Sequence, residues 1–546
     1  MTVAANIDDQ TSGADSGQAG VVMKKTANAT VARADTIGVR DDAEARAVFL
    51  ASFTCQEEKH IMRKVDKQFL LLIGFMYMIK QASLLPNIDQ TNASNVRVLQ
   101  LGEPRNIMTE LKMTSDQYNW VGSIYGISFI LFEVPSNLLL KRFSPHVWQS
   151  RIFFMWGIIT ACQAASQNRH QLYAMRFLLG MFEAGMFPGV MAQLSSWYRT
   201  DEMGKPVTWL YTFVNLSGII GALLCYGISY MNGLQGLSAW RWVYLLEGIV
   251  TVLFAGIVFW VLPDYPKSPR SGRFLSEREQ EFVEARLPEN APVTSDPNFS
   301  GKEIVATLRS PLIWAFLISQ ATLNIGCYAL IWYLPTIITS MGFTGLPENQ
   351  LLNIPPSAAA ILSVLAAAWL IGRAYFVRPA GAVVLLAGMV ACFIVFFTVS
   401  DRIGIYMACI LSNAFFNGYY LIFWAWRSAT LSGSTAAAFT LAFQSGLAQV
   451  GVIVGPQLFP SKWAYNRYKN SFAIAGAFTI VSFLANLWTW WLTRNTEYDV
   501  MRVRREILKA RAEGKVLVSD DIHIFNERQF YTGLRRNYAE QVREKA

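Results

Sequence analysis

The stretch RFLLGMFEAGMFPG, residues 176–189, places an arginine and a glutamate in sequence that is otherwise apolar enough to cross a membrane. A charge at the bilayer centre costs about 2.5 kcal/mol or more, a cost tolerated mainly where the charge faces a bundle interior or a watery cavity. At 100° per residue, Arg176 and Glu183 lie within about 20° of one helix face, with Gly180 between them. This stripe predicts either a role in transport or an ion pair that only locks two helices together.

The composition is that of a membrane protein. The 546 residues are 53% hydrophobic and 16% charged, with a mean hydropathy of +0.28, whereas soluble domains carry roughly 25% charged residues. The 17 Trp and 35 Phe residues suit an apolar body with aromatic belts at the membrane interfaces. The net charge of +9 does not indicate nucleic-acid binding, because Lys and Arg cluster between the apolar runs.

Motifs of other functional classes are missing from the sequence. The six Cys form no C-x-x-C pair, and four His without an H-E-x-x-H motif predict no metal site. There is no phosphate-binding loop, nucleophile elbow or dinucleotide motif, so we expect neither an enzyme nor a cofactor. Residues 1–66 lack an early apolar run, which argues against a cleavable signal peptide.

Twelve apolar runs of about 20 residues have the length that an α-helix needs to span a bilayer. They predict an all-α membrane protein with six spans, a long polar loop and six more spans. The predicted spans are 68–88, 118–140, 148–167, 170–193, 206–230, 242–262, 311–333, 350–371, 379–400, 403–424, 434–459 and 471–493. The expected domains are a disordered arm (1–66), two six-helix halves (67–262 and 311–493), a central loop (263–310) and a charged tail (494–546).

The distribution of Lys and Arg predicts the orientation. The central loop is rich in both, whereas the connection after span 7 has neither. The positive-inside rule therefore places the even-numbered connections and both termini in the cytoplasm. Three basic residues after span 11 are a local exception. The tail sequence VMRVRREILKARAEGK (500–515) predicts either a solvated helix or an amphipathic helix on the cytoplasmic leaflet.

Further polar side chains lie at helical spacing inside the spans. In span 2, Glu133 and Asn137 are four residues apart, with Pro135 between them to bend the helix. In span 10, Asn413 and Asn417 have the same spacing. Such pairs suit either the orientation of a ligand or hydrogen bonding between helices. Packing or structural roles are expected of three others: Gln444, Gln449 and Glu247.

The motif R-F-L-L-G-x-F-E-A-G-x-F-P-G, followed by WYRTDEMGK, resembles span 4 of the anion:cation symporters of the major facilitator superfamily. The resemblance is to their fungal allantoate, nicotinate and pantothenate permease branch. The same branch has motifs similar to FEVPSNLLLKR, WRWVYLLEG, LPDYP, YLPTII and LLNIPP. IDQTNASN, residues 88–95, resembles the end of span 1 in pantothenate-permease-like members. Together these motifs cover nearly everything between residues 67 and 495.

The resemblance implies a twelve-helix fold whose two halves expose a central site to each side in turn. In relatives the span-4 Arg contacts the anionic substrate and the Glu seven residues later couples to protons, which assigns these roles to Arg176 and Glu183. Other candidate substrate contacts are Asn92, Asn413, Asn417 and Tyr328; other candidate proton-coupling groups are Glu133 and Asp89. The expected partners are a small organic anion, protons and the lipid bilayer. The expected protein is a monomeric, multi-pass plasma-membrane permease.

Two departures from the family pattern bear on coupling. WLIGRAY puts Gly372 where the family has the Asp of an Asp-Arg pair, so a cytoplasmic gating contact is expected to be missing. QASLLPN (81–87) and LQLGEPRNIM (99–108) lengthen the sequence around the first outer loop, enough to move Asp89 from the cavity to the surface. Either span 1 is broken and re-enters, or these stretches are unspliced sequence.

The leading interpretation is a proton-coupled importer of a small organic anion. An exporter of a secondary metabolite in the same fold and a sensor that binds its ligand without moving it are the alternatives.

Overall fold

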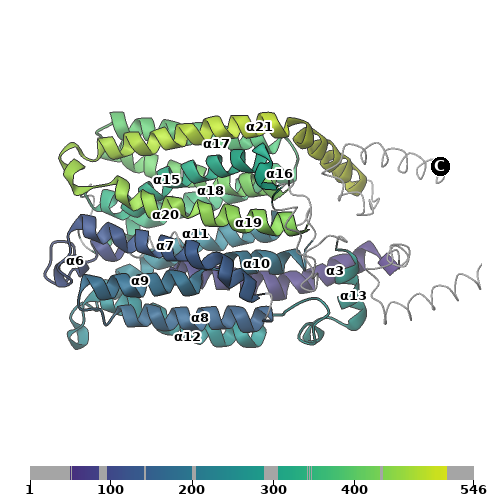
Figure 1. The fold of residues 1–546 in the computed structure, drawn as a ribbon, viewed down its shortest axis with the longest axis horizontal. Helices are drawn as coiled ribbons and strands as arrows, with labels where there is room; N and C mark the ends of the chain where they lie inside the picture. Colours follow the sequence, from purple (N-terminus) through teal and green to yellow (C-terminus); the bar gives the residue numbers. More distant parts are fainter. Residues whose placement is uncertain are drawn as a thin grey trace, which may run out of the picture.

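The computed structural model describes residues 49–50, 52–84, 95–140, 143–198, 204–287 and 305–512, apart from 306, 341, 343–344, 346, 429 and 431–433. Within these residues every regular element is a helix. The long helices lie side by side in one bundle (Figure 1). Twelve helical segments of the described chain coincide with the twelve predicted spans, apart from residues 85–88, which lie outside it, so the all-α membrane fold is confirmed.

The first six spans form one half of the bundle. Two of them are composite: the π-helical turn η1 (Asp66–Leu70) with α4 (Leu71–Leu84), and α9 (Arg169–Glu183) with α10 (Met186–Ser195). The single helices are α7 (Ser115–Leu140), α8 (Pro145–Gln163), α11 (Gly204–Ser229) and α12 (Ala239–Val261). In this half α8 packs along α12, α7 along α9, and α4 along α11.

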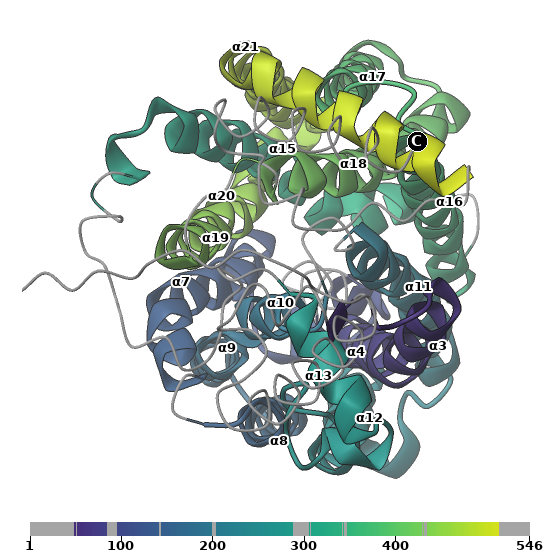
Figure 2. The ribbon, with the colours of Figure 1, turned by 90° about the vertical axis from the view of Figure 1, so that its right-hand side faces the viewer.

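The last six spans form the other half. The composite spans are η4 (Glu348–Asn353) with α16 (Ile354–Gly372), and α19 (Ser434–Ala448) with α20 (Val450–Val454) and η5 (Gly455–Leu458). The single helices are α15 (Pro311–Ser340), α17 (Arg378–Thr398), α18 (Arg402–Ser428) and α21 (Lys469–Ala512). Viewed along the bundle, this half lies above the first (Figure 2). The halves meet where α11 contacts α16 and where α7 contacts α20.

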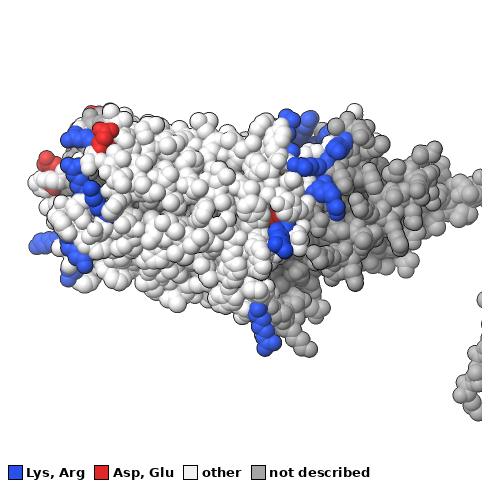
Figure 3. Space-filling view, turned by 90° about the horizontal axis from the view of Figure 1, so that it is seen from above, with Lys and Arg blue, Asp and Glu red and all other residues white. Residues whose placement is uncertain are grey.

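Apolar side chains cover the outside of the bundle. Leu131, Leu253, Leu362 and Val384 are between 60% and 69% exposed. The face in Figure 3 has a wide uncharged middle, with Lys and Arg at its two ends. Seven helices of the described chain are long and apolar enough to cross a membrane. An apolar belt between charged rims is the surface of a protein that spans a membrane, with the belt in the lipid hydrocarbon and the rims at the two membrane surfaces.

Both ends of the described chain lie at the same end of the bundle, which we call the termini end (Figure 1). The helix α13 (Glu277–Ala285), from the connection between the halves, also lies there. The opposite end, which carries α6 (Ile107–Glu110), is called the far end. The first and last described residues therefore lie on one side of the bundle, as an even number of spans requires.

Helix α3 (Cys55–Val65) corrects the prediction of disorder up to residue 66. Thr54 and Glu57 form a capping box that satisfies the first backbone N–H groups of this helix. Lys64 Nζ lies 2.8 Å from Glu279 Oε1 of α13, which ties the two polar helices together. Burial pushes the pKa of Glu279 up, but Lys64 and the capping contacts of α13 outweigh burial and leave that pKa below its ordinary value.

The lengthened loop after span 1 packs into the far end. Val96 and Leu99 are buried, and Asn106 Nδ2 donates to the carbonyl oxygens of Arg97 (2.9 Å) and Leu99 (2.7 Å). Buried side chains and hydrogen bonds within the loop therefore hold its described part at this end of the bundle. Residues 85–94 lie outside the described residues.

Two glycines set the distance between α8 and α12. A methyl group on Gly248 would lie 2.6 Å from the carbonyl oxygen of Gly157 and 2.7 Å from Cα of Ala161, so the backbone would have to move. Gly256, on the same helix, has open space at the corresponding position. Small residues allow this kind of close approach between membrane helices.

We expect Gly248→Ala to lower the melting temperature of the detergent-solubilised protein in a thermal-shift assay, because over-packing costs about 1–3 kcal/mol. Gly256→Ala is the matched control, and it should leave the melting temperature unchanged or slightly raised, since Ala favours a helix over Gly by up to about 1 kcal/mol. Equal melting temperatures for the two variants would contradict the close contact of α8 with α12.

Candidate functional site

Span 4 breaks within its charged stretch. Helix α9 ends at Glu183, Ala184 has φ −55° and ψ 134°, and Gly185 has φ 92° before α10 begins. A positive φ of this size favours glycine. A side chain on Gly185 would also run into Ser136 of α7. The break therefore packs against span 2 and leaves Glu183 fully buried at the end of α9.

Arg176 is held inside the first half. It is 1% exposed, and its Nη2 donates to Tyr244 Oη of α12 at 2.8 Å. The guanidinium also lies over the Tyr244 ring, 5.4 Å from the centroid. Tyr118 of α7 interacts with Tyr244 and faces Trp332 of the other half, with ring centroids 6.0 Å apart. Tyr118 therefore links the Arg176–Tyr244 pair to the second half.

Gly180 serves close packing. A Cβ at this position would lie 2.5 Å from the carbonyl oxygen of Tyr125, so the glycine lets α9 approach α7. The glycine in the middle of the span-4 stripe therefore serves tight contact between α9 and α7.

Two carboxylates are buried near the contact between the halves. Glu183 lies close enough to Tyr77 of α4 to interact with it electrostatically. Glu133 of α7 is 1% exposed, and a Cβ on Gly446 of α19 would lie 3.1 Å from its Oε2. Glu133 therefore faces the second half directly. The side chain of Asn137 lies outside the described part of the chain.

Tyr328 belongs to a buried cluster of tyrosines and amides. Gln320, Asn324 and Tyr328 are spaced four residues apart on α15 and share one face. Tyr420 of α18 donates to Asn324 Oδ1. The ring of Tyr211, from α11 of the first half, lies 6.2 Å from that of Tyr420. Both halves therefore contribute to this cluster, which we call the central cluster.

The two asparagines of span 10 make different contacts. Asn413 Nδ2 donates to the carbonyl of Pro356 at 2.9 Å and so joins α18 to α16 within one half. Asn417 Oδ1 accepts from Asn215 Nδ2 of α11 at 3.0 Å, which joins the two halves. Interhelical hydrogen bonding therefore accounts for Asn413, and Asn417 is a bridge between the halves.

Five residues at the centre are not predicted from the sequence: Tyr211, Asn215, Gln320, Asn324 and Tyr420. The four-residue spacing of polar side chains on α15 is a sequence signal that identifies two of them. The positions of the other three depend on which helices meet across the halves. Conversely, the predicted candidates Asn92 and Asp89 lie outside the described residues.

Hydrogen bonds between the halves close the far end. Asn119 Oδ1 of α7 accepts from Trp332 Nε1 of α15 at 3.0 Å. Within the second half, Tyr333 Oη donates to the carbonyl of Phe459 at 2.6 Å, which fixes the hydroxyl that Asn119 contacts. Asn119 Nδ2 lies 3.3 Å from Tyr333 Oη. Arg97 lies over the Tyr333 ring, 4.7 Å from the centroid, and its Nη1 donates to Asn119 Oδ1 at 3.3 Å.

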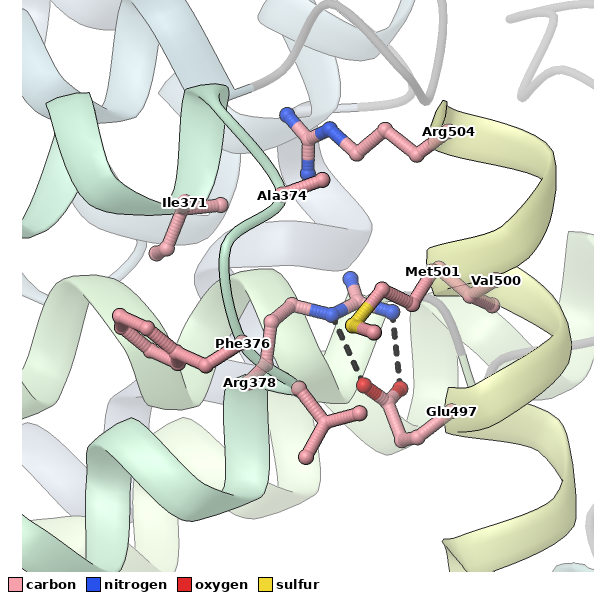
Figure 4. Close-up of a pocket in the computed structure, with 9 residues that line it drawn as sticks. Ile371, Ala374, Phe376, Arg378, Glu497, Val500, Met501 and Arg504 are labelled. Atoms are coloured by element: carbon pink, nitrogen blue, oxygen red, sulfur yellow. Dashed lines mark hydrogen bonds and ion pairs between the residues drawn. The ribbon is translucent and has the colours of Figure 1, made fainter. Parts of the chain in front are cut away.

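A pair of polar side chains joins corresponding helix ends in each half. At the start of α8, His146 Nδ1 lies 2.7 Å from Asp264 Oδ1, just after α12. At the start of α17, Arg378 makes two bonds of 2.9 and 2.8 Å to Glu497 of α21 (Figure 4). The sequence predicts a missing contact at this connection because of Gly372. The Arg378–Glu497 pair holds the connection instead.

Residues 70–456 match the Major Facilitator Superfamily. The chain belongs to this superfamily. It is 30% identical over 337 residues to the MFS transporter prlL of a fungal species (strain NRRL 50135), covering 61% of the chain and 66% of that protein. It is 27% identical over 410 residues to the MFS-type transporter cnsO of Penicillium expansum, covering 73% and 76%.

Two further similarities reach bacterial proteins. This major facilitator protein is 30% identical over 260 residues to the putative metabolite transport protein NicT of Pseudomonas putida, covering 47% of the chain and 58% of that protein. A solved bacterial homologue of the human lysosomal transporter Spinster, inward-facing and occupied, superposes with a TM-score of 0.53 at 14% identity, covering 78% and 96%. The latter likeness concerns the fold alone.

The role of Asn119 in closing the far end of this major facilitator protein can be tested by cysteine labelling. Ser123, one turn beyond Asn119 on α7, is buried and donates to the carbonyl of Ile453 at 2.7 Å. With Ser123→Cys as a reporter, Asn119→Ala should speed its reaction with a thiol reagent in detergent by roughly three- to tenfold, because each interhelical hydrogen bond contributes about 0.6 kcal/mol. Cys55 and Cys162 are replaced by Ser to remove background labelling.

The control for this experiment is Gln167→Ala, which removes an exposed amide at the same end of the bundle. It should leave the labelling rate unchanged. A rate that is equally unchanged by Asn119→Ala would contradict a role of Asn119 in closure.

Proposed function

We propose that this protein is a proton-coupled symporter of a small organic anion, of the anion:cation symporter branch, which works by alternating access. The observation that carries the proposal is the position of Glu133, buried on α7 and facing Gly446 across the contact between the halves. When the halves rock apart, this carboxyl passes from a dry contact into water. Its affinity for protons then differs between the two states, which is what coupling requires.

Glu183 is the second proposed proton-coupling group. Its burial at the break of span 4 places a carboxyl where the backbone changes direction. A small rotation of α10 against α9 would alter its surroundings. A buried carboxyl of this kind suits a proton relay in a transporter.

Donors for an anion are present in both halves. Arg176 provides a guanidinium, the group that matches a carboxylate with two parallel hydrogen bonds. The amides and hydroxyls of the central cluster are suited to orienting a small polar molecule, as the few polar groups of a ligand site do. Asn417 and Tyr328 stay candidate substrate contacts on this basis.

We place the termini end in the cytoplasm and the protein in the plasma membrane. The basic central loop supports this orientation through the positive-inside rule. The far end, closed by Asn119 and Tyr333, then faces outward. In the proposed cycle, carboxyls load protons from the acidic exterior, the anion pairs with Arg176, and the halves rock to release both inside.

The test is uptake of labelled pantothenate, nicotinate, biotin and allantoate in permease-deficient yeast at external pH 5 and pH 7.5. We expect one acid to accumulate at pH 5 and much less at pH 7.5. An exporter would instead protect cells from a compound without accumulating it, and a sensor would bind a ligand without flux. Either result would contradict the proposed import.

Glu183→Gln should abolish the pH dependence of uptake, because an amide keeps the size of the side chain but holds no exchangeable proton. Accumulation at pH 5 is expected to fall by at least about tenfold, towards equal concentrations inside and outside. The reason is that a gradient of one pH unit stores about 1.4 kcal/mol per proton, which supports a tenfold concentration ratio of the cotransported acid. Uptake is measured against surface protein in each strain.

Glu133→Gln should act in the same direction. Glu103→Gln is the matched control for both substitutions, since Glu103 is an exposed carboxylate of the far end. Wild-type accumulation at pH 5 in both Glu183→Gln and Glu133→Gln would refute proton coupling through these residues.

A further inference from the structure

Arg427 is a buried cation near the termini end of α18. It is 3% exposed, and its Nε donates to Gln444 Oε1 of α19 at 2.8 Å. Its Nη1 donates to Thr430 Oγ1 at 3.0 Å. The guanidinium also lies over the ring of Phe316 of α15, 4.6 Å from the centroid. These partners come from α15, α19 and the turn after α18, and all of them are neutral.

Arg427 differs in this respect from Arg378 at the same end of the same half. Arg378 is paired by both oxygens of Glu497 (Figure 4). Among the described residues, no carboxylate lies within ion-pair distance of Arg427. A buried charge without a counter-ion is costly, so such a guanidinium suits a site that an anion visits.

A continuous line of hydrogen bonds joins Arg427 to the central cluster. Gln444 accepts from Arg427 and donates through Nε2 to Gln320 Oε1 at 2.7 Å. Gln320 lies one turn from Asn324 on α15, and Tyr420 contacts both of them. The line therefore runs from the centre of the bundle towards the termini end, through side chains that all have hydrogen-bonding groups.

We propose that Arg427 is a second anion-binding station, which takes the carboxylate of the transported molecule on the termini side of the central cluster. Gln444 and Thr430 hold the guanidinium in place, and an arriving carboxylate bonds to its remaining N–H groups. The proposal rests on the proposed transport of an organic anion. In this proposal the anion leaves the protein by way of Arg427 in the second half, whereas Arg176, the other proposed anion contact, belongs to the first half.

The test uses right-side-out and inside-out vesicles from permease-deficient yeast, with pantothenate, nicotinate, biotin and allantoate as labelled probes. Nicotinamide is the uncharged match to nicotinate. Arg427→Gln should raise the KM for the transported acid offered on the termini side by about tenfold or more, as expected for a lost hydrogen-bonded charge. The KM on the far side should stay within about twofold of wild type. Nicotinamide should show no dependence on Arg427.

Two further variants separate charge from structure. Arg427→Lys keeps the charge without the planar fork and should restore part of the termini-side affinity. Arg373→Gln removes an exposed arginine of the same half and should behave as wild type. If Arg427→Gln fails to reach the membrane, the KM of Arg427→Lys on the termini side is the deciding measurement. A wild-type KM overturns the proposal. A KM that is raised on the termini side alone supports it.

The outcomes distinguish this inference from the function on which it rests. An unchanged KM in Arg427→Gln, or equal increases on both sides, overturns the Arg427 station and leaves the symporter intact. A wild-type protein that moves none of the four acids from either side overturns the anion substrate and the Arg427 station together.

Discussion

Every polar group inside the bilayer needs a partner within the protein, and this constraint organises the whole bundle. Lipid offers no hydrogen bonds, so the helices satisfy their own backbones and bury their polar side chains against one another. Arg176 donates a hydrogen bond to Tyr244, and Arg427 donates one to Gln444. Asn215 donates to Asn417 across the contact between the halves. The outside can then be almost uniformly apolar, as its exposed leucines and valines show.

The same constraint bears on the proposed movement of the two halves against each other. Within each half the contacts are close: Gly248 against Gly157 in the first, and the Arg378–Glu497 pair in the second. Between the halves, many of the polar contacts are hydrogen bonds of neutral groups, such as Asn119 with Tyr333 and Asn215 with Asn417, and the charged Arg97 and Asp116 add contacts at the far end. Neutral hydrogen bonds in a membrane contribute little each, about 0.6 kcal/mol on average. They are suited to being broken and re-formed in each transport cycle.

The fold could be predicted from the sequence because hydropathy measures directly what the bilayer demands. All twelve spans were recoverable from run length alone, including span 4 in spite of its charges. The break at Gly185 was not predicted, because it depends on the contact with Ser136 of another helix. Helix α3 was missed because its capping box lies in a polar region that composition marks as disordered.

The site was predicted less completely than the fold. Charges inside apolar runs stand out in a sequence, so Arg176, Glu183 and Glu133 could be singled out, and all three are buried. Amides and tyrosines stand out less, and Asn215 and Tyr420 gain their importance only from neighbours across the halves. The replacement of the expected Asp near Gly372 by a contact from α21 also required the packing of the helices.

The most direct test of proton coupling is proton movement itself. Purified protein in liposomes containing a pH-sensitive dye would receive, with no initial pH gradient, the acid that cells accumulate. Proton-coupled symport predicts that the lumen acidifies as the acid enters, and that acidification disappears in Glu133→Gln. Entry of the labelled acid at the wild-type rate without any change in luminal pH would contradict it.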